Sequence, residues 1–468
     1  MEITGKENIF GRRYIHQTFA TCSVNILTFS HGIGLGWITP ILYNMQFNAM
    51  ESMLGVTISA EVISWIGSLL AIGGLTGGFI AGIILPKIGI KRTLTVLPIP
   101  HLCFWLLTHL VKTSTPYHFY VGRVLCGICG GGCFVAIPLF ISEISSPNVR
   151  GRLGSLFLVT LNTGVLFGFI LAHYLRPLFI VPIFCACLLC LYYFILLTYL
   201  FDTPQYLIKI GLIDEAKKSL QFYWNSTDQK DVELDEYFDT LSQKIQTSFE
   251  TINEKNETML RTLFKTQHLK AVIIGFGLVS VNQFSGSFSI INYSTAILEQ
   301  SKSFTLDLGT STILLLLLQI LGTYSATLTV DRFGRKIVLI ISASCSAIGL
   351  LSAGVFDYLC YEFDVLKDYS WILILSLASV IYFANMGVCT VCFIAMVEVL
   401  PIQVRSVGTC ICMVFSSAVC FTALKLFPVL IDSIGFYGVM WTFGTLTTIG
   451  LFFLIVVVPE TKGKSMME

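Results

Sequence analysis

The sequence predicts an all-α membrane protein with twelve transmembrane helices in two six-helix repeats. Three observations support this fold class: an excess of apolar residues, twelve apolar runs of membrane-spanning length, and charge motifs that recur in both halves. Hydrophobic residues make up 54% of the 468 residues and charged residues only 12%, and the mean hydropathy is +0.78. A soluble domain usually carries about 25% charged residues, so this much apolar surface is expected to face lipid.

The apolar runs set the boundaries of the spans. A helix needs roughly 20 residues to cross about 30 Å of hydrocarbon, and at that length only a helix satisfies its own backbone hydrogen bonds in lipid. The first six runs cover residues 18–40, 62–85, 94–112, 118–140, 154–174 and 178–200. The other six cover residues 270–292, 310–330, 337–356, 371–396, 407–428 and 438–458.

A long polar segment, residues 205–268, separates the two sets of spans. Its amphipathic turns around Asp214 and Lys217 favour short helices on the membrane surface over a separate catalytic domain. The predicted organisation is an N-terminal segment 1–17, a first bundle 18–204, a linker 205–268, a second bundle 269–458 and a tail 459–468.

Basic residues are distributed unevenly between the loops of the two sides. With the N-terminus inside, the inner loops and tail hold eleven: Lys87, Lys91, Arg92, Arg150, Arg152, Arg332, Arg335, Lys336, Arg405, Lys462 and Lys464. The outer loops hold four: Lys112, Arg176, Lys302 and Lys367. Such an excess is typical of the cytoplasmic side. The sequence therefore predicts a multi-pass protein of the cell membrane with both termini in the cytoplasm.

Matching charge motifs mark corresponding points of the two halves. Glu143 precedes Arg150 by seven residues after the fourth span, and Glu398 precedes Arg405 by seven after the tenth. The basic motif at residues 86–92 follows the second span, and a similar motif at residues 331–336 follows the eighth. Two six-helix repeats predict a transporter whose site lies between the halves.

Several motifs together carry a family resemblance. They are Gly122-Arg123 with Gly127, Glu143…Arg150-Gly151-Arg152, Asp331-Arg332-x-Gly334-Arg335-Lys336, Gln283-x-Ser285-Gly286 and Pro459-Glu460-Thr461-x-Gly463. With these motifs in this order, the chain resembles the sugar porter family of the major facilitator superfamily from its first span to its last residues. The segments 64–68 and 423–427 look like the insect trehalose-transporter-like branch. The resemblance implies transport of a monosaccharide or trehalose by alternating access, in a monomer with no cofactor and no enzymatic activity.

The resemblance also implies which residues bind the substrate. Carried over by position, these are Gln283 and Asn282 in the seventh span, Gln319 in the eighth, Asn385 and Phe393 in the tenth and Ser416 in the eleventh. Amides offer both donors and acceptors to a hydroxyl-rich neutral ligand, and an aromatic ring can stack on a pyranose face. The alternative is that each amide makes an interhelical hydrogen bond that stabilises the bundle.

Five residues depart from the family pattern. Phe288 replaces an asparagine, Leu158 replaces a glutamine, Cys392-Phe393 replaces Pro-Trp, and Pro86 stands where the first loop motif has an acid. The pocket is therefore expected to be less polar than that of a glucose carrier, and the identity of the sugar stays open. A polyol carrier and a non-transporting sugar sensor on the same fold remain alternatives.

Charged residues at helix ends predict a gate. Acids and bases on one membrane face could form a cluster that holds the cytoplasmic side shut: Glu143, Arg150, Asp331, Arg332, Arg335, Glu398 and Arg405. The alternative is that these charges only set the topology. Tyr293, ten residues after Gln283, matches a gate position in the family, although it could simply pack.

Facilitated diffusion is favoured over proton coupling. The first span, 18–40, contains no Asp or Glu, and Gly34 stands where proton-coupled sugar porters carry an Asp. His31 could titrate, but a lone histidine among small residues is more often structural. Cys126, Cys129 and Cys133 have helical spacing without acids or histidines among them, so we expect packing residues and no metal. The net charge of +1 argues against a nucleic-acid partner.

Overall fold

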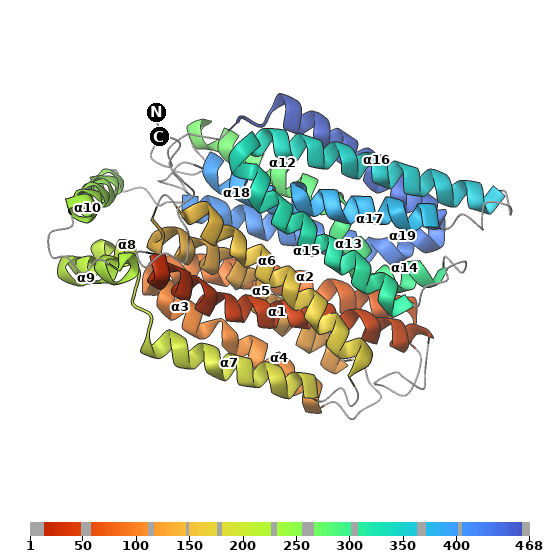
Figure 1. Ribbon diagram of the computed structural model, residues 1–468, viewed down its shortest axis with the longest axis horizontal. Coiled ribbons are helices and arrows are strands. Elements are labelled where there is room, and N and C mark those ends of the chain that lie inside the picture. Colours follow the sequence, from red (N-terminus) through yellow and green to blue (C-terminus); the bar gives the residue numbers. More distant parts are fainter. Residues whose placement is uncertain are drawn as a thin grey trace.

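The computed structural model describes residues 14–47, 58–110, 117–146, 149–175, 180–225, 232–254, 266–300, 308–362, 371–400 and 405–460. All regular elements within these ranges are helices, and the long helices of the bundle lie side by side along one common direction (Figure 1). The all-α prediction is therefore confirmed for the described part of the chain.

The helices form a first set, a linker set and a second set. The first set is α1 (Ile15–Phe47), α2 (Ala60–Ile88), α3 (Ile90–Val96), α4 (Pro98–Leu110), α5 (Tyr117–Ile144), α6 (Arg150–Tyr174) and α7 (Ile180–Thr198). The linker set is α8 (Pro204–Lys209), α9 (Ile213–Trp224) and α10 (Val232–Glu254). The second set is α12 (Thr266–Phe284), α13 (Ser287–Asn292), α14 (Ser294–Gln300), α15 (Leu308–Phe333), α16 (Arg335–Glu362), α17 (Trp371–Met386), α18 (Val388–Val399) and α19 (Arg405–Val456). Figure 1 shows the first set below the second.

These helices account for twelve spans. Ten helical segments among the described residues are long and apolar enough to cross a membrane. The third predicted span is divided into α3 and α4, at a proline that has no backbone N–H, and adds one more. The segment α19 contains two spans, because the chain turns at Gly435 with φ +74° and ψ 168°. Only glycine adopts that backbone conformation without strain.

Glycines bring two helix pairs of the first set into backbone contact. A Cβ atom added to Gly127 of α5 would lie 2.8 Å from the Cα of Gly73 in α2. One added to Gly164 of α6 would lie 3.0 Å from the Cα of Gly32 in α1. Small residues at such crossings allow helices in lipid to pack closely and gain van der Waals energy.

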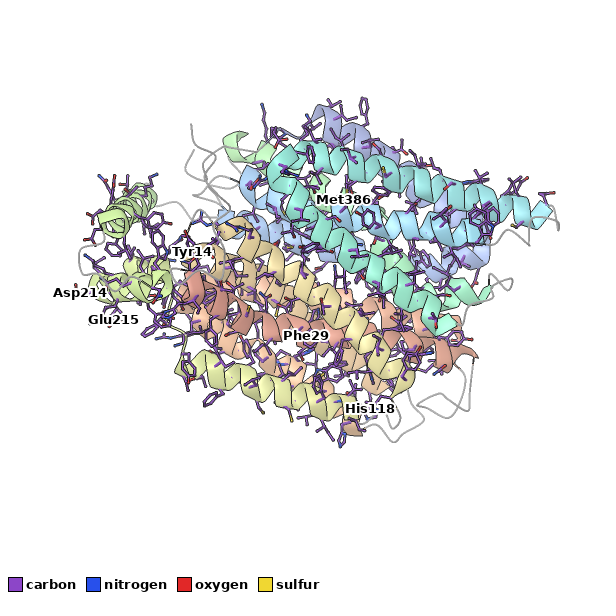
Figure 2. The ribbon with its side chains drawn as sticks, viewed as in Figure 1. Tyr14, Phe29, His118, Asp214, Glu215 and Met386 are labelled. Atoms are coloured by element: carbon purple, nitrogen blue, oxygen red, sulfur yellow. The ribbon has the colours of Figure 1, made fainter. Side chains whose placement is uncertain are left out.

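The linker helices α8–α10 pack at one end of the first set, which we call the linker end (Figure 1). His16 at the start of α1 lies 2.8 Å from the carbonyl of Phe222 in α9 through its Nδ1. The Trp224 ring of α9 packs on Tyr237 of α10 at a centroid distance of 4.9 Å. Asp214 and Glu215 point away from the bundle at this end, which suits an amphipathic surface helix (Figure 2).

Candidate functional site

The seventh span is interrupted at the predicted motif that follows Gln283. The chain leaves α12 at Phe284 and enters α13 at Ser287, with Gly286 at a left-handed φ of +73°. The Ser285 hydroxyl donates to the Asn282 carbonyl at 2.7 Å, which satisfies one of the acceptors that the break exposes. Interrupted helices in transporters place freed backbone groups and polar side chains at mid-membrane depth.

The tenth span is interrupted as well, and the two breaks face each other. Gly387 between α17 and α18 has φ −141° and ψ −72°. Asn282 donates its amide to the Val388 carbonyl at 3.1 Å, just beyond this break. Asn385 donates to the Ser287 hydroxyl at 3.2 Å. Met386 marks the break near the middle of the second set (Figure 2).

A serine from α16 completes the backbone pairing at the tenth-span break. The Ser342 hydroxyl donates to the Phe383 carbonyl at 2.6 Å and accepts the Val388 N–H at 2.8 Å. One side chain therefore replaces two backbone hydrogen bonds that the interrupted helix cannot make. This arrangement holds the break in a defined geometry.

Gln283 and Ser416, two of the proposed binding residues, lie in contact with each other. The Gln283 Nε2 donates to the Ser416 hydroxyl at 3.0 Å and joins α12 to α19. Gln283 is half-buried, whereas Ser416 is buried. This contact is compatible with both hypotheses for Gln283, because an amide that bridges two helices can also exchange that bond for a ligand hydroxyl.

Gln319 makes a polar contact between the two sets of helices. Its Nε2 donates to Asn162 Oδ1 at 3.0 Å, and Asn162 Nδ2 donates to the Thr323 hydroxyl at 2.7 Å. The Gln319 Oε1 is buried without a hydrogen-bond partner among the described residues. Asn162, which lies one helical turn after Leu158 on α6, was not predicted from the sequence. A polar amide is energetically costly in an apolar span, and this signal in the sequence could have identified Asn162.

Phe393 faces the first set. Its ring lies 5.8 Å from that of Phe134 in α5, and Phe134 packs in turn on Phe157 of α6 at 5.0 Å. The predicted stacking residue therefore belongs to an aromatic group that both halves share.

Tyr293 lies between α13 and α14 and contacts both halves. Its hydroxyl donates to the Leu424 carbonyl at 3.1 Å, and its ring stacks on Phe427 at 5.3 Å with planes 5° apart. A Cβ atom added to Gly67 of α2 would lie 2.6 Å from the same hydroxyl. The glycine therefore gives the tyrosine its space in the first set.

Polar contacts near Tyr293 also join α2 to α19. Lys425 Nζ donates to the Ser64 hydroxyl at 2.8 Å and lies 4.1 Å from the centre of the Trp65 ring. Arg123 is buried in α5 and donates its Nε to the Ile66 carbonyl at 3.0 Å. These contacts lie at the end opposite the linker end, since α2 begins there. The sequence alone did not predict the pairing of Lys425 with Ser64.

The charged residues predicted as a gate lie at the linker end. Arg335 Nη2 and Glu398 Oε1 form an ion pair at 3.1 Å that joins α16 to α18 within the second set. Glu460 accepts the backbone N–H groups of Arg335 and Lys336 at 3.0 and 3.1 Å, where its charge favours the start of α16. The side chains of Asp331 and Arg405 lie outside the described residues.

Of the remaining gate residues, Arg150 contacts the end of α5 and the linker helix α10. Arg150 donates to the Ser145 carbonyl at 3.2 Å, and its Nη2 lies 3.5 Å from the Tyr237 hydroxyl of α10. Burial lowers the pKa of the Lys209 ammonium in α8, and the Glu143 carboxylate nearby acts in the opposite direction. Arg332 is exposed at the end of α15.

Together these side chains offer amide and hydroxyl groups at two facing helix breaks, and the halves contact each other at Gln319 and at the end opposite the linker end. The polar groups around the breaks are neutral: Asn282, Gln283, Ser287, Asn385 and Ser416. Such groups suit a neutral ligand rich in hydroxyls better than an ion.

Comparison with known proteins identifies relatives over almost the whole chain. Residues 20–468 match the family described as "Sugar (and other) transporter". The facilitated trehalose transporter Tret1 of Apis mellifera ligustica is 33% identical over 459 residues, which cover 97% of this chain and 88% of that protein. The Bombyx mori Tret1 is 28% identical over 455 residues and covers 97% and 86%.

Solved structures share the fold. The proton:xylose symporter XylE bound to 6-bromo-6-deoxy-D-glucose superposes with a TM-score of 0.77 at 20% identity, covering 97% of this chain and 98% of that one. The inward open conformation of XylE from E. coli gives a TM-score of 0.73 at 20% identity, covering 96% and 98%. The twelve spans in two halves, the motifs at their ends and the match over residues 20–468 lead to one conclusion: the chain belongs to the sugar (and other) transporter family.

Proposed function

We propose that this protein carries a neutral sugar, a monosaccharide or trehalose, across the plasma membrane by alternating access. The observation that carries the proposal is the set of neutral amides and hydroxyls at the facing breaks of α12/α13 and α17/α18. The names of the similar insect proteins support trehalose as a substrate to test first.

The binding residues proposed are Gln283, Asn282, Gln319, Asn385, Phe393 and Ser416. Gln319 contacts the first half through Asn162, so a ligand there would touch both halves at once. A ligand that bridges the halves favours the closed arrangement, which is what coupling of binding to a conformational change requires. The proposed division into halves at residues 204 and 269 suits a mechanism in which the two halves move relative to each other around the ligand.

Two gates alternate in this mechanism. At the end opposite the linker, Tyr293 and the Lys425–Ser64 contact close the pathway. At the linker end, the ion pair of Arg335 and Glu398 holds the ends of α16 and α18 together. The other predicted gate residues, Glu143, Arg150, Asp331, Arg332 and Arg405, act with it on the cytoplasmic side.

The transport mode proposed is facilitated diffusion. Proton coupling needs a titratable group in the pathway, and α1 carries no carboxylate. A Cβ atom at Gly34 would lie 3.2 Å from Cys126 Sγ and 3.6 Å from His101 Cε1, so the space that a longer side chain would need is filled. Uptake should therefore persist when a protonophore collapses the proton gradient, whereas strong inhibition would refute this mode.

Uptake of radiolabelled trehalose, glucose and a polyol in oocytes tests the proposed function. Gln283→Ala should reduce sugar uptake at least tenfold, because the amide's hydrogen bonds to the ligand are lost. Gln243→Ala on the exposed face of α10 is the matched control and should leave uptake unchanged. Flux of the polyol alone would favour the polyol carrier, and sugar binding without any flux would favour the sensor.

The proposed orientation places both termini and the linker helices in the cytoplasm, as the distribution of basic residues predicts. An epitope tag at the N-terminus should be accessible to antibody only after the cells are permeabilised. A signal on intact cells would refute the orientation. A single chain contains all the proposed binding residues, so the functional unit is taken to be the monomer.

A further inference from the structure

Three metal-ligating side chains meet inside the first set of helices, away from the proposed sugar site. They are His31 of α1, His101 of α4 and Cys126 of α5, with 4%, 0% and 0% of their surfaces exposed. One potential ligand atom from each lies within 4.8 Å of the others. Because the three come from different spans, their approach is a product of the fold.

Two glycines provide the space for this cluster. A Cβ atom on Gly130 would overlap the His31 ring, so the imidazole lies directly on the α5 backbone. A Cβ atom on Gly34 would lie 3.2 Å from Cys126 Sγ and 3.6 Å from His101 Cε1. Without these glycines the rings and the thiol could not converge.

The distances fit coordination of one ion. His31 Nδ1 and Cys126 Sγ are 3.6 Å apart. Bonds of about 2.0 Å to nitrogen and about 2.3 Å to sulfur, at tetrahedral or trigonal angles, separate the two ligand atoms by about 3.6–3.8 Å. The His101 ligand atom lies within 4.8 Å of the other two, so an inward shift of at most about 1 Å completes such a site.

His101 has a nitrogen available for this purpose. Its Nε2 accepts the Trp105 Nε1–H at 3.1 Å and lies 3.1 Å from the Ser30 hydroxyl. Its Nδ1 is buried without a hydrogen-bond partner among the described residues. If Nδ1 binds an ion, the ring proton moves to Nε2 and is donated to the Ser30 oxygen. Such a hydrogen bond orients a ligating histidine, although Trp105 loses its acceptor.

The surrounding charge decides which ion fits. Arg123 lies one helical turn before Cys126 on the same face of α5, and its Nη1 is buried without a partner among the described residues. The helices α1, α4 and α5 carry one carboxylate, Glu143, near the linker end of α5. A divalent ion on one thiolate would leave a positive charge beside this guanidinium, which is costly in an apolar interior.

We propose that His31, His101 and Cys126 bind a single cuprous ion. The monovalent ion and the Cys126 thiolate sum to zero charge, and thiolate and imidazole ligands suit Cu(I). Binding forms one copper–sulfur and two copper–nitrogen bonds and releases the thiol proton to solvent, with no change of oxidation state. Because all three ligands belong to the first half, the ion stiffens that half and does not tie it to the second.

Anaerobic titration of the full-length protein in detergent tests this site. The probe is Cu(I) supplied as its bicinchoninate complex with ascorbate, and copper transfer is measured as loss of the complex's absorbance. The wild-type protein should take up one tight equivalent that Cys126→Ser and His101→Gln lack. The copper X-ray absorption edge of the wild-type complex should show both nitrogen and sulfur ligands.

Cys129→Ser is the matched control, since Cys129 is buried one turn away on α5 and pairs with Cys133 at 3.8 Å and not with a histidine. This variant should keep the tight equivalent. Copper should also raise the Tm of the wild-type protein and of Cys129→Ser only, because an ion that binds the native state stabilises it. Retention of the equivalent by Cys126→Ser, equal loss in Cys129→Ser, or a sulfur-only edge would each overturn the proposal. If Cys126→Ser does not fold, His101→Gln and the wild-type edge decide.

Discussion

The Tyr293 hydroxyl satisfies a carbonyl that the eleventh span cannot satisfy itself. In a regular helix the Leu424 carbonyl accepts the N–H of residue 428, but that residue is Pro428 and has no N–H. Tyr293 donates its hydroxyl to this carbonyl at 3.1 Å. The gate residue is therefore held by a backbone acceptor that a proline four residues away leaves open.

Tyr293→Phe removes this hydrogen bond and keeps the ring stacked on Phe427. The buried Leu424 carbonyl is then left without a donor, which costs about 1–3 kcal/mol in the arrangement seen here. If the contact forms only when this end is closed, the ratio of closed to open molecules falls about 5- to 150-fold.

Pro428→Ala supplies the control. Alanine restores a backbone N–H to the Leu424 carbonyl, so the tyrosine hydroxyl is no longer its only donor. Tyr293→Phe in the Pro428→Ala background should therefore have a small effect. The double-mutant cycle isolates the coupling between Tyr293 and Pro428, which we expect to be about 1 kcal/mol or more.

Spin labels report the closed fraction at this end. Glu61 at the start of α2 and Ser433 before the Gly435 bend are both exposed and can carry a label each, in a background whose exposed cysteines are replaced by serine. The population with the shorter label distance should fall in Tyr293→Phe and recover in the double variant. Equal losses with and without Pro428, or an unchanged distance distribution, would refute the reasoning.

Three further predictions concern other contacts. Glu398→Gln weakens the largely buried ion pair with Arg335. The free energy of unfolding should therefore fall by about 2 kcal/mol, and the linker end should open more often. An unchanged Tm in detergent would contradict this. Asn162→Leu removes the amide between the halves and should raise the KM of sugar uptake about tenfold, whereas an unchanged KM would place Gln319 outside the sugar site. Ser342→Ala loses both hydrogen bonds at the tenth-span break and should lower the free energy of unfolding by about 1–3 kcal/mol. Ser346→Ala one turn later should be neutral, since that hydroxyl has no partner among the described residues; equal Tm values would refute the role of Ser342.

The number and type of spans could be predicted from the sequence because hydrocarbon thickness and backbone pairing leave little freedom. The predicted division of the last two spans at residues 428–438 matches the bend at Gly435. The division of the third span was not predicted, although Pro98 removes a backbone donor there. Hydropathy averages over such single-residue effects, so it finds spans more readily than the breaks within them.

The candidate site was predicted in part. The motif at Gln283–Gly286 did predict where polar groups gather, whereas the hydrogen bond between Gln283 and Ser416 was not predicted. Asn162 was not predicted, because the comparison with the family pattern concerned Leu158, whereas the residue one turn later on the same face of α6 makes the contact. The cluster of His31, His101 and Cys126 depends on how three spans rotate about their own axes. That rotation is set by glycine contacts between helices, which no pattern in a single span encodes.

The glycine contacts of the first half are expected to make it stiffer than the second half. Where the backbones of α2 and α5 touch at Gly73 and Gly127, no side chain is present to slide or rearrange, so that pair behaves as a stiff frame. In the second half, by contrast, two spans are themselves interrupted by residues with non-helical torsions, Gly286 and Gly387. A ligand that binds at these interruptions would therefore bend the spans of the second half locally, whereas the packed helices of the first half would keep their arrangement. The conformational change would then consist mainly of the second half closing over a first half that changes little.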